Sequence, residues 1–226
     1  MRTILSFLVL CTLILPLSGQ DTLQSLETPF EHLKVSGNIR LVLIPSHTQE
    51  LEFKPGQDRE AIKFEIREKE LILKAKTELK KSPAIQLKLK YKSLLGLEVN
   101  TGAHVSSADT LAAKVFTLKA ETGGKAELRI LADSISARVN QGADIILYGR
   151  TRIQSVNAYT WGNYLSNDLD VETTWVKAAT GAQVKVNAGD MLHINSTSKA
   201  TVGYWGEPGE KQISTSVGGE VTQLTE

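Results

Sequence analysis

A short pattern repeats along the second half of the chain, and it restricts the possible folds more than any other feature. A turn of the type Thr-Gly-Ala recurs every 18–21 residues from residue 96 onward. Its copies are centred on Gly102, Gly123, Gly142, Trp161, Gly181, Lys199 and Gly218. A unit of this length cannot bury an apolar face by itself, so the repeat predicts units that stack around a continuous core.

Residue columns across the copies identify each unit as a pair of strands. The fifth position before each centre is apolar, the position after it is Ala or Gly, and apolar and polar residues alternate on both sides. Alternation with a period of two is typical of β-strands. Glycine at most centres indicates a corner with positive φ, and the small residue after it indicates a corner without room for an inward side chain. We therefore predict an all-β fold, a parallel β-helix or related solenoid with rungs of about 19–20 residues.

Residues 21–95 lack this period, but their alternation also predicts strands. The expected strands are Phe30–Val35, Ile39–Ile44, Glu50–Phe53, Ala61–Ile66, Leu71–Lys76 and Ile85–Tyr91. An uncovered solenoid end is an edge at which chains aggregate. We therefore expect residues 21–95 to form an N-terminal β-layer that caps or extends a solenoid of residues 96–226. No linker separates the two sections, so we expect one continuous domain.

The first twenty residues, MRTILSFLVLCTLILPLSGQ, have the order of a secretory signal peptide. Arg2 precedes an apolar run that Pro16 ends, and this run is too short for a comfortable transmembrane span. We predict cleavage near Gln20, no transmembrane segment in the mature chain, and a periplasmic, cell-surface or secreted location. An uncleaved anchor helix is the alternative. A lipoprotein is disfavoured because Cys11 lies inside the apolar run.

Charge and cysteine content argue against several classes of protein. The chain has 26 basic and 25 acidic residues, a balance that argues against binding nucleic acid or a membrane through bulk charge. Cys11 is the only cysteine, so neither an intrachain disulfide nor a cysteine-based zinc site is possible. We expect no cofactor, no metal and no nucleic-acid partner.

The overall pattern resembles a known family. The chain opens with Phe-x-x-Leu-x-Val-Ser-Gly-x-Ile-x-Leu-x-Leu from Phe30 to Leu43, continues through the Gly-Ala turns, and reaches Tyr-Trp-Gly-Glu-Pro at Tyr204–Pro208. This order is similar to the putative auto-transporter adhesin, head GIN domain family, over residues 29–224. The resemblance implies a secreted or envelope protein with a β-helical fold, and it supplies no catalytic motif. Trp161 and Lys199 depart from the Gly-Ala turn of the family.

Catalytic chemistry has one candidate location. Neither His-Glu-x-x-His nor Gly-x-Ser-x-Gly is present, and His104 and His193 are expected to be solvated on outward strand positions. Polysaccharide-degrading β-helix enzymes need clustered carboxylates, as acid and base or around calcium. Asp168, Asp170 and Glu172 would share one face of an extended strand. The alternative interpretation of these residues is a polar turn that solubilises the edge of the coil.

Aromatic residues offer a different kind of site. Trp161 replaces the corner glycine, Tyr159 lies two residues before it, and Trp205 lies near the end of the repeats. Flat aromatic rings on a rigid surface can stack on sugars or anchor a partner. Our ligand-binding candidates are therefore Tyr159, Trp161 and Trp205. The alternative is that Trp161 folds over an irregular rung and Trp205 shields the C-terminal end of the core.

Three functional hypotheses follow from these patterns. The first is a non-catalytic, adhesin-like module that binds a glycan or an envelope or surface protein. The second is a polysaccharide lyase or hydrolase that uses the acidic cluster. The third is a structural protein that self-associates through the solenoid ends. The sequence leaves the ligand and the oligomeric state open, and fold analogy does not choose between adhesion and catalysis.

Overall fold

The computed structural model describes residues 23–76 and 83–225. The predicted signal peptide lies outside the described residues. In the N-terminal part the strands are β1 (Leu23–Ser25), β2 (His32–Ser36), β3 (Ile39–Pro45), β4 (Glu50–Phe53), β5 (Ile62–Arg67), β6 (Glu70–Ala75) and β7 (Ile85–Tyr91), with a short 3₁₀ turn η1 (Arg59–Ala61) before β5. Each predicted strand of residues 21–95 is present, with ends within two residues of the expected positions.

The repeats contain the remaining strands. They are β8 (Gly96–Asn100), β9 (His104–Ser107), β10 (Leu111–Glu121), β11 (Lys125–Val139), β12 (Asp144–Ala158), β13 (Asn163–Ser166), β14 (Leu169–Ala178), β15 (Gln183–Asn187), β16 (Met191–Thr197), β17 (Thr201–Trp205), β18 (Glu210–Ser216) and β19 (Glu220–Gln223). Within the described ranges, none of the chain forms a helix long and apolar enough to cross a membrane.

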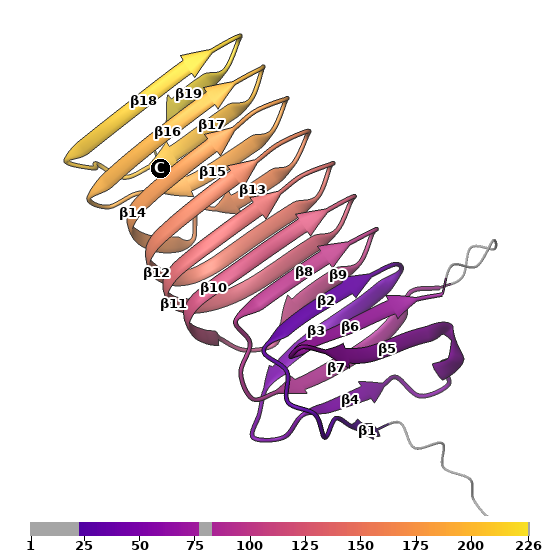
Figure 1. The fold of residues 1–226 in the computed structure, drawn as a ribbon. Helices are drawn as coiled ribbons and strands as arrows, with labels where there is room; N and C mark the ends of the chain where they lie inside the picture. The colour runs from indigo at the N-terminus through magenta and orange to yellow at the C-terminus, as the bar shows by residue number, and fades with distance from the viewer. Residues whose placement is uncertain (1–22, 77–82, 226) are drawn as a thin grey trace, which may run out of the picture.

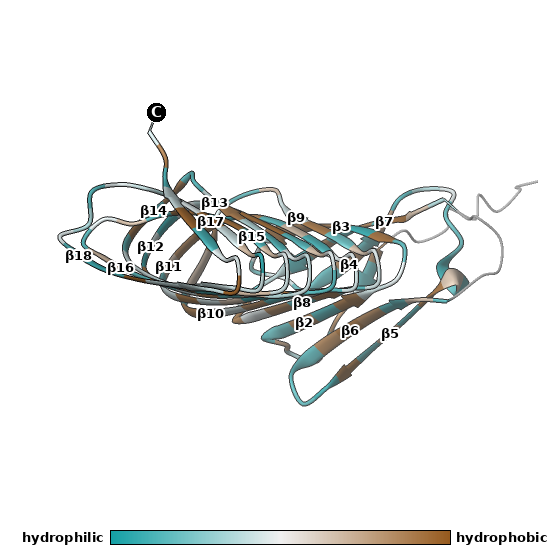
Figure 2. Ribbon diagram, turned by 90° about the horizontal axis from the view of Figure 1, so that it is seen from above, coloured by the Kyte–Doolittle hydropathy of each residue, from teal (hydrophilic) through white to brown (hydrophobic). Residues whose placement is uncertain are grey.

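Each rung consists of a strand, a tight turn and a returning strand, and the rungs stack in parallel (Figure 1). We call the two walls the pre-turn sheet, which includes β8, β14, β16 and β18, and the post-turn sheet, which includes β9, β13, β15, β17 and β19. The long strands β10, β11 and β12 include the corner opposite the turn. Seen from above, the rungs overlap as flattened loops, each displaced from the next (Figure 2). The predicted parallel β-solenoid is confirmed.

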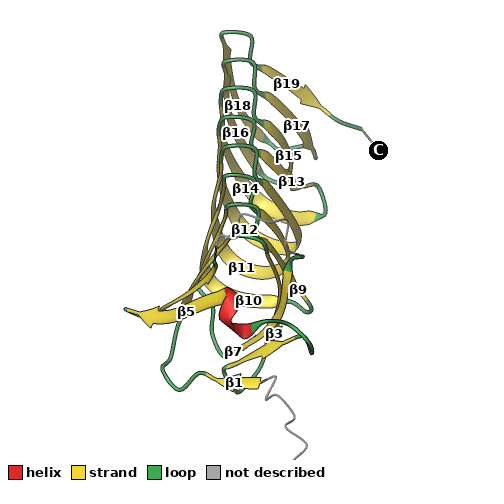
Figure 3. Ribbon diagram, turned by 90° about the vertical axis from the view of Figure 1, so that its right-hand side faces the viewer, coloured by secondary structure: helices red, strands yellow, loops and turns green. Residues whose placement is uncertain are grey.

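The turns form one column along the molecule (Figure 3). Both central residues of each turn have positive φ, as in Thr101 (53°) and Gly102 (74°), which is the geometry of a type I′ turn. Turns hydrogen-bond to one another: the Gly102 N–H donates to the Thr122 carbonyl at 3.2 Å, and the Gly123 N–H donates to the Gln141 carbonyl at 3.1 Å. The backbone ladder therefore continues through the corner.

The small residue after each turn is explained by close packing against the neighbouring rung. A Cβ on Gly124 would lie 2.2 Å from the Val99 carbonyl oxygen, a separation that no side chain tolerates. Ala103 and Ala143 occupy equivalent positions in other rungs and are fully buried. The expectation that this corner has no room for a larger inward side chain is confirmed.

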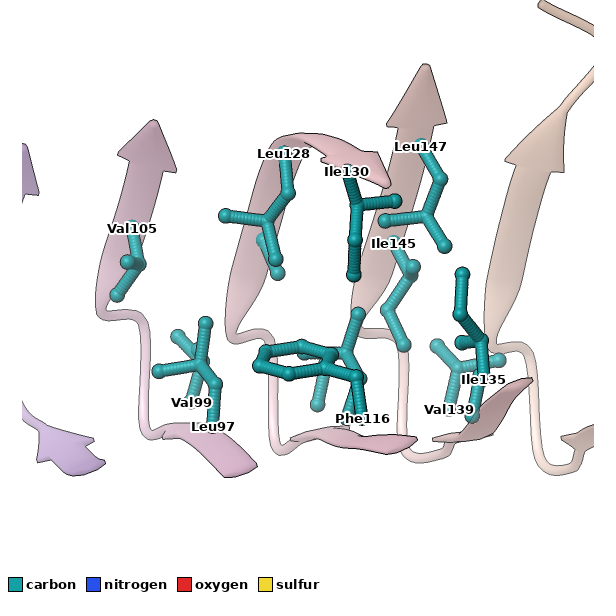
Figure 4. Close-up of a cluster of buried hydrophobic side chains, with 14 of the residues drawn as sticks. Leu97, Val99, Val105, Phe116, Leu128, Ile130, Ile135, Val139, Ile145 and Leu147 are labelled. Atoms are coloured by element: carbon teal, nitrogen blue, oxygen red, sulfur yellow. The ribbon is translucent and has the colours of Figure 1, made fainter. Parts of the chain in front are cut away.

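Inward side chains of the two sheets fill the solenoid. Figure 4 shows this core in the first rungs, where side chains from both sheets project into the space between them. Phe116, Leu128 and Ile135 are among the fully buried members. Removal of such side chains from water is the main favourable contribution to folding, and it has to hold this domain without a disulfide.

The core contains a polar cluster around Gln154 of β12. Its side-chain Nε2 donates to the Thr174 hydroxyl at 3.0 Å and to the Asn187 carbonyl at 3.2 Å. Its Oε1 accepts from the Tyr164 hydroxyl at 3.0 Å and from the Ser166 hydroxyl at 3.1 Å. Gln154, Tyr164, Ser166 and Thr174 are all fully buried. Each polar group has a partner, so the network avoids the cost of a stranded buried group.

The N-terminal section extends the solenoid and also covers its end. β2 pairs in parallel with both β6 and β8, and β3 pairs in parallel with both β7 and β9. The β2–β3 rung is therefore inserted between the β6–β7 pair and the first repeat. Antiparallel pairing of β5 with β6, β4 with β7 and β1 with β4 then covers this end (Figure 1).

The C-terminal rung, β18 and β19, ends the stack with polar side chains at core-facing positions. Lys211 is in register with buried Leu192, Thr215 with buried Ser196, and Gln223 with buried Tyr204. Inward charges and polar terminal repeats are known devices against edge-to-edge aggregation. Two core-facing positions of this rung are apolar: Ile213, with 45% exposure, and Val221, which is in register with buried Val202.

Candidate binding surface

The outer face of the pre-turn sheet carries aligned rows of side chains because its strands are parallel and in register. One row runs through Ser155 of β12, Trp175 of β14, His193 of β16 and Gln212 of β18. The neighbouring row runs through Arg138, Asn157, Lys177, Asn195 and Ser214. We call these two rows, together with Tyr159, the aromatic–amide face.

A stacked aromatic pair is the most distinctive feature of this face. The rings of Trp175 and His193 lie 3.9 Å apart between centroids, with an interplanar angle of 10°. His193 covers one face of the indole, and the residue in register on the other side is the short Ser155. Trp175 remains 45% exposed. The arrangement leaves an apolar ring face held rigidly at the surface.

A groove of about 730 Å³ runs beside this pair. Its polar lining includes Asn157, Lys177 and Asn195. The Tyr159 hydroxyl donates to the Asn157 Oδ1 at 3.4 Å, which places this tyrosine at the edge of the same amide row. Amides and an ammonium next to a flat ring can hydrogen-bond the hydroxyls of a molecule that stacks on the ring.

The histidines differ from their expected state. His193 keeps only 16% side-chain exposure, and its Nε2 lies 3.8 Å from the Glu210 Oε1. The Nε2 of His104, on the post-turn sheet, is buried without a hydrogen-bond partner. Burial lowers the pKa of His104, and the positive charges of Lys125 and Arg40 lower it further. The expectation that both histidines are solvated is wrong, because packing between neighbouring rungs removes them from water.

The structure separates the three predicted binding residues. Tyr159 borders the aromatic–amide face. Trp161 lies in the turn with φ 61° and 66% exposure, and its ring lies against Gly181 of the next turn, where an added Cβ would be 2.9 Å from it. Trp205 ends β17 on the opposite, post-turn sheet and pairs with Asn187. The three residues therefore do not form one site, and Trp205 lies apart from the other two.

The acidic cluster forms ion pairs instead of a catalytic groove. The Asp170 carboxylate lies 3.2 Å from the Arg150 Nε, and the Glu172 carboxylate lies 3.5 Å from the Arg152 Nε. Asp168 is exposed in the corner before β14. Within the described ranges, no group of three His, Cys, Asp or Glu side chains is placed to hold a metal ion. The geometry gives no support to the interpretation of these residues as an acid–base pair.

The sequence analysis missed the Trp175–His193 pair, although its signal was present. Both residues lie six positions before their turn centres, Gly181 and Lys199. In a parallel solenoid, equal offsets from successive turns place side chains next to each other on neighbouring strands. Tabulating the outward columns as well as the inward ones would have found the pair.

Comparisons with known proteins agree with this fold. A putative adhesin from Bacteroides fragilis NCTC 9343 aligns with a TM-score of 0.78 at 14% identity, covering 89% of this chain and 96% of its own. A putative lipid binding protein from Parabacteroides distasonis ATCC 8503 aligns with a TM-score of 0.68 at 14% identity, covering 90% and 96%. A putative adhesin from the same strain aligns with a TM-score of 0.64 at 18% identity, covering 89% and 95%.

At these identities the structural likeness establishes the fold alone. A search of curated proteins finds none that matches. The sequence match is more specific, because residues 29–208 fit the family described as putative auto-transporter adhesin, head GIN domain. That match covers most of the chain, including the opening strands, the turns and the Tyr-Trp-Gly-Glu-Pro segment. The chain therefore belongs to the putative auto-transporter adhesin, head GIN domain family.

Proposed function

We propose that this protein is an exported, non-catalytic binding module of the adhesin-like type that holds a carbohydrate on its aromatic–amide face. The observation that carries the proposal is the stacked Trp175–His193 pair beside the groove. A rigid, partly exposed indole costs little conformational entropy on binding and offers a flat apolar surface to a sugar ring. Asn157 and Asn195 supply donors and acceptors for the ring hydroxyls.

Membership of an adhesin-like family supports a location outside the cell or at its surface. The signal-peptide pattern of residues 1–20 also supports export from the cytoplasm. Catalysis is disfavoured in this proposal because the acidic side chains with the best sequence spacing are paired with Arg150 and Arg152. One structural relative is named for lipid binding; for this chain we favour a carbohydrate because the groove is lined by amides and hydroxyls next to one aromatic pair.

A glycan array with residues 21–226 tests the proposal, with and without calcium. We expect saturable binding without product release. Trp175→Ala should weaken binding about tenfold or more, since one aromatic stacking contact contributes about 0.5–1.5 kcal/mol beyond its buried area. Trp205→Phe is the matched control on the opposite sheet and should bind as the unmodified protein does.

Three outcomes would contradict the proposal. Equal affinity of the Trp175→Ala and Trp205→Phe variants would remove the aromatic–amide face from the site. Release of shortened sugars would favour an enzyme and would direct attention back to Asp168 and Asp170. No binding to any glycan would favour a protein ligand or a structural role.

A further inference from the structure

We infer that the carbohydrate held by the aromatic–amide face is a linear acidic polysaccharide that lies along the solenoid axis. This inference rests on the proposed function and names its ligand class. It starts from the distribution of charge: the outward positions of β11, β12, β14 and β16 next to the turns contain no carboxylate, and the carboxylates of Glu121 and Glu210 lie on the flanking strands β10 and β18. These positions are Ser134, Ser136, Arg138 and Asn140, then Ile153, Ser155, Asn157 and Tyr159, then Thr173, Trp175, Lys177 and Ala179, then Met191, His193, Asn195 and Thr197.

The absence of carboxylates is unusual for this chain, in which acidic residues are as frequent as basic ones. Several cations elsewhere are matched by anions on the neighbouring strand, as in Lys34 with Glu98 at 2.5 Å and Lys90 with Glu50 at 2.7 Å. On the aromatic–amide face, by contrast, Arg138 and Lys177 are both exposed, and neither has an ion-pair partner among the residues that the structure describes. Their charges are therefore available to a ligand.

The strand register places two cations next to each other on this face, which destabilises the protein in the absence of a ligand. Lys119 of β10 lies directly in register with Arg138 of β11, and like charges opposite each other on adjacent strands are destabilising. Glu98 lies in register with Lys119 on the other side and helps to balance that lysine. Arg138 has no such compensation, because its next neighbour in the row is the neutral Asn157. An anionic ligand would relieve the repulsion.

The spacing of the row fits a polymer better than a small ion. Arg138, Asn157 and Lys177 occupy consecutive strands, so the two cations are two strand spacings apart, about 9–10 Å. This is close to the length of two sugar units, with the amide opposite the space between the charges. Trp175 stands beside Lys177 on the same face of β14, so the carboxylate of a sugar that contacts the indole can reach the ammonium.

The test is binding of hyaluronan, alginate and polygalacturonate to residues 21–226 by calorimetry, with fully methyl-esterified polygalacturonate as the uncharged counterpart. We expect at least one acidic polymer to bind, affinity to fall as salt is raised, and the ester to bind at least about tenfold more weakly than the acid if polygalacturonate is that polymer. The Arg138→Gln/Lys177→Gln double variant should lose about tenfold in affinity for the acidic polymer.

A charge-matched control separates this face from bulk charge. Arg129→Gln/Lys185→Gln removes the same two charges from exposed positions on the post-turn sheet and should leave affinity within about twofold. Equal losses in the two double variants would overturn the inference, because the effect would then reflect net charge alone. Binding only to vesicles that contain anionic phospholipid would also overturn it, in favour of a lipid surface.

Failure of the inference can be distinguished from failure of the proposed function. If acid and ester bind equally, and only Trp175→Ala weakens both, the aromatic–amide face still binds carbohydrate but does not select acidic chains. If no acidic polymer binds while neutral glycans do, the ligand class is wrong and the site stands. If no carbohydrate of either kind binds, both are refuted.

Discussion

The buried network around Gln154 offers the most quantitative test of how this solenoid is held together. Gln154→Leu replaces the amide with an apolar side chain of similar size. The Thr174 hydroxyl keeps its 2.7 Å bond to the Asn187 carbonyl, and the Ser166 hydroxyl has the Lys185 carbonyl at 3.5 Å. The Tyr164 hydroxyl loses the acceptor that it has in the structure. Burial raises the pKa of Tyr164 far above its ordinary value, so the hydroxyl stays protonated and has no hydrogen-bond acceptor in the variant.

The expected magnitude follows from these contacts. A buried polar group without a partner costs about 1–3 kcal/mol, and each lost hydrogen bond contributes about 1 kcal/mol more. We therefore expect Gln154→Leu to lower the free energy of unfolding by about 2–4 kcal/mol, which corresponds to about 4–16 °C in thermal midpoint for a domain of this size. Tyr164→Phe alone should cost only about 1 kcal/mol, because the Gln154 Oε1 still accepts from Ser166.

Thermal unfolding of the two single variants and the double variant measures this coupling. The double variant has no stranded hydroxyl, so its loss should be smaller than the sum of the single losses by about 1–2 kcal/mol. Urea unfolding at fixed temperature provides an independent value. Strict additivity would refute the reasoning, because it would show that Tyr164 does not depend on Gln154.

Three further predictions concern the ends, the turns and pH. Lys211→Leu should increase the dependence of sedimentation on concentration, because it completes an apolar core row at the open end; unchanged sedimentation would count against the capping role of this lysine. Trp161→Gly should stay within about 1 kcal/mol of the unmodified protein in its free energy of unfolding, since relief of left-handed strain offsets the lost contact with Gly181; a cooperative loss of fold would contradict this. His104→Gln should reduce the fall in thermal midpoint between pH 7 and pH 5. The folded-state pKa of His104 is lowered, so below the ordinary histidine pKa the unfolded chain binds a proton at this residue that the folded chain does not bind. The folded state is therefore less stable as pH falls. An identical pH profile for the variant would refute this.

The repeat made much of the fold predictable from the sequence alone. The turn favours glycine at its centre, as at Gly102 and Gly142, and a small residue directly after it, as at Ala103 and Ala143. These residues therefore mark the turns in the sequence. The same alignment fixes register, and register determines which side chains meet across strands. Tyr164, for example, is in register with Ile145 and Val184 and is buried as they are.

Other features depend on spatial order, which a sequence pattern does not encode. The alternation of Leu33 and Val35 predicts a strand equally well beside any neighbour, so nothing in it places β2 between β6 and β8. Likewise, the spacing of Asp170 and Glu172 predicts a shared strand face but not the arginines of the preceding rung. In both cases the neighbouring strand or side chain is determined by how the rungs stack, and the local sequence does not specify it.

The two ends and the two sheets of the solenoid differ in what they can bind. The N-terminal end is covered by β1, β4 and β5, and the C-terminal rung places Lys211 and Gln223 where core residues would otherwise continue. Self-association through the ends is therefore disfavoured by the same polar side chains that end the stack. Both sheets carry paired charges, Lys34 with Glu98 on the pre-turn sheet and Lys125 with Glu127, 3.6 Å apart, on the post-turn sheet. The pre-turn sheet retains unpaired cations and an exposed indole, which do little for stability but suit a ligand. This division is consistent with the proposed function, because the ends resist stacking while one side stays open along its length.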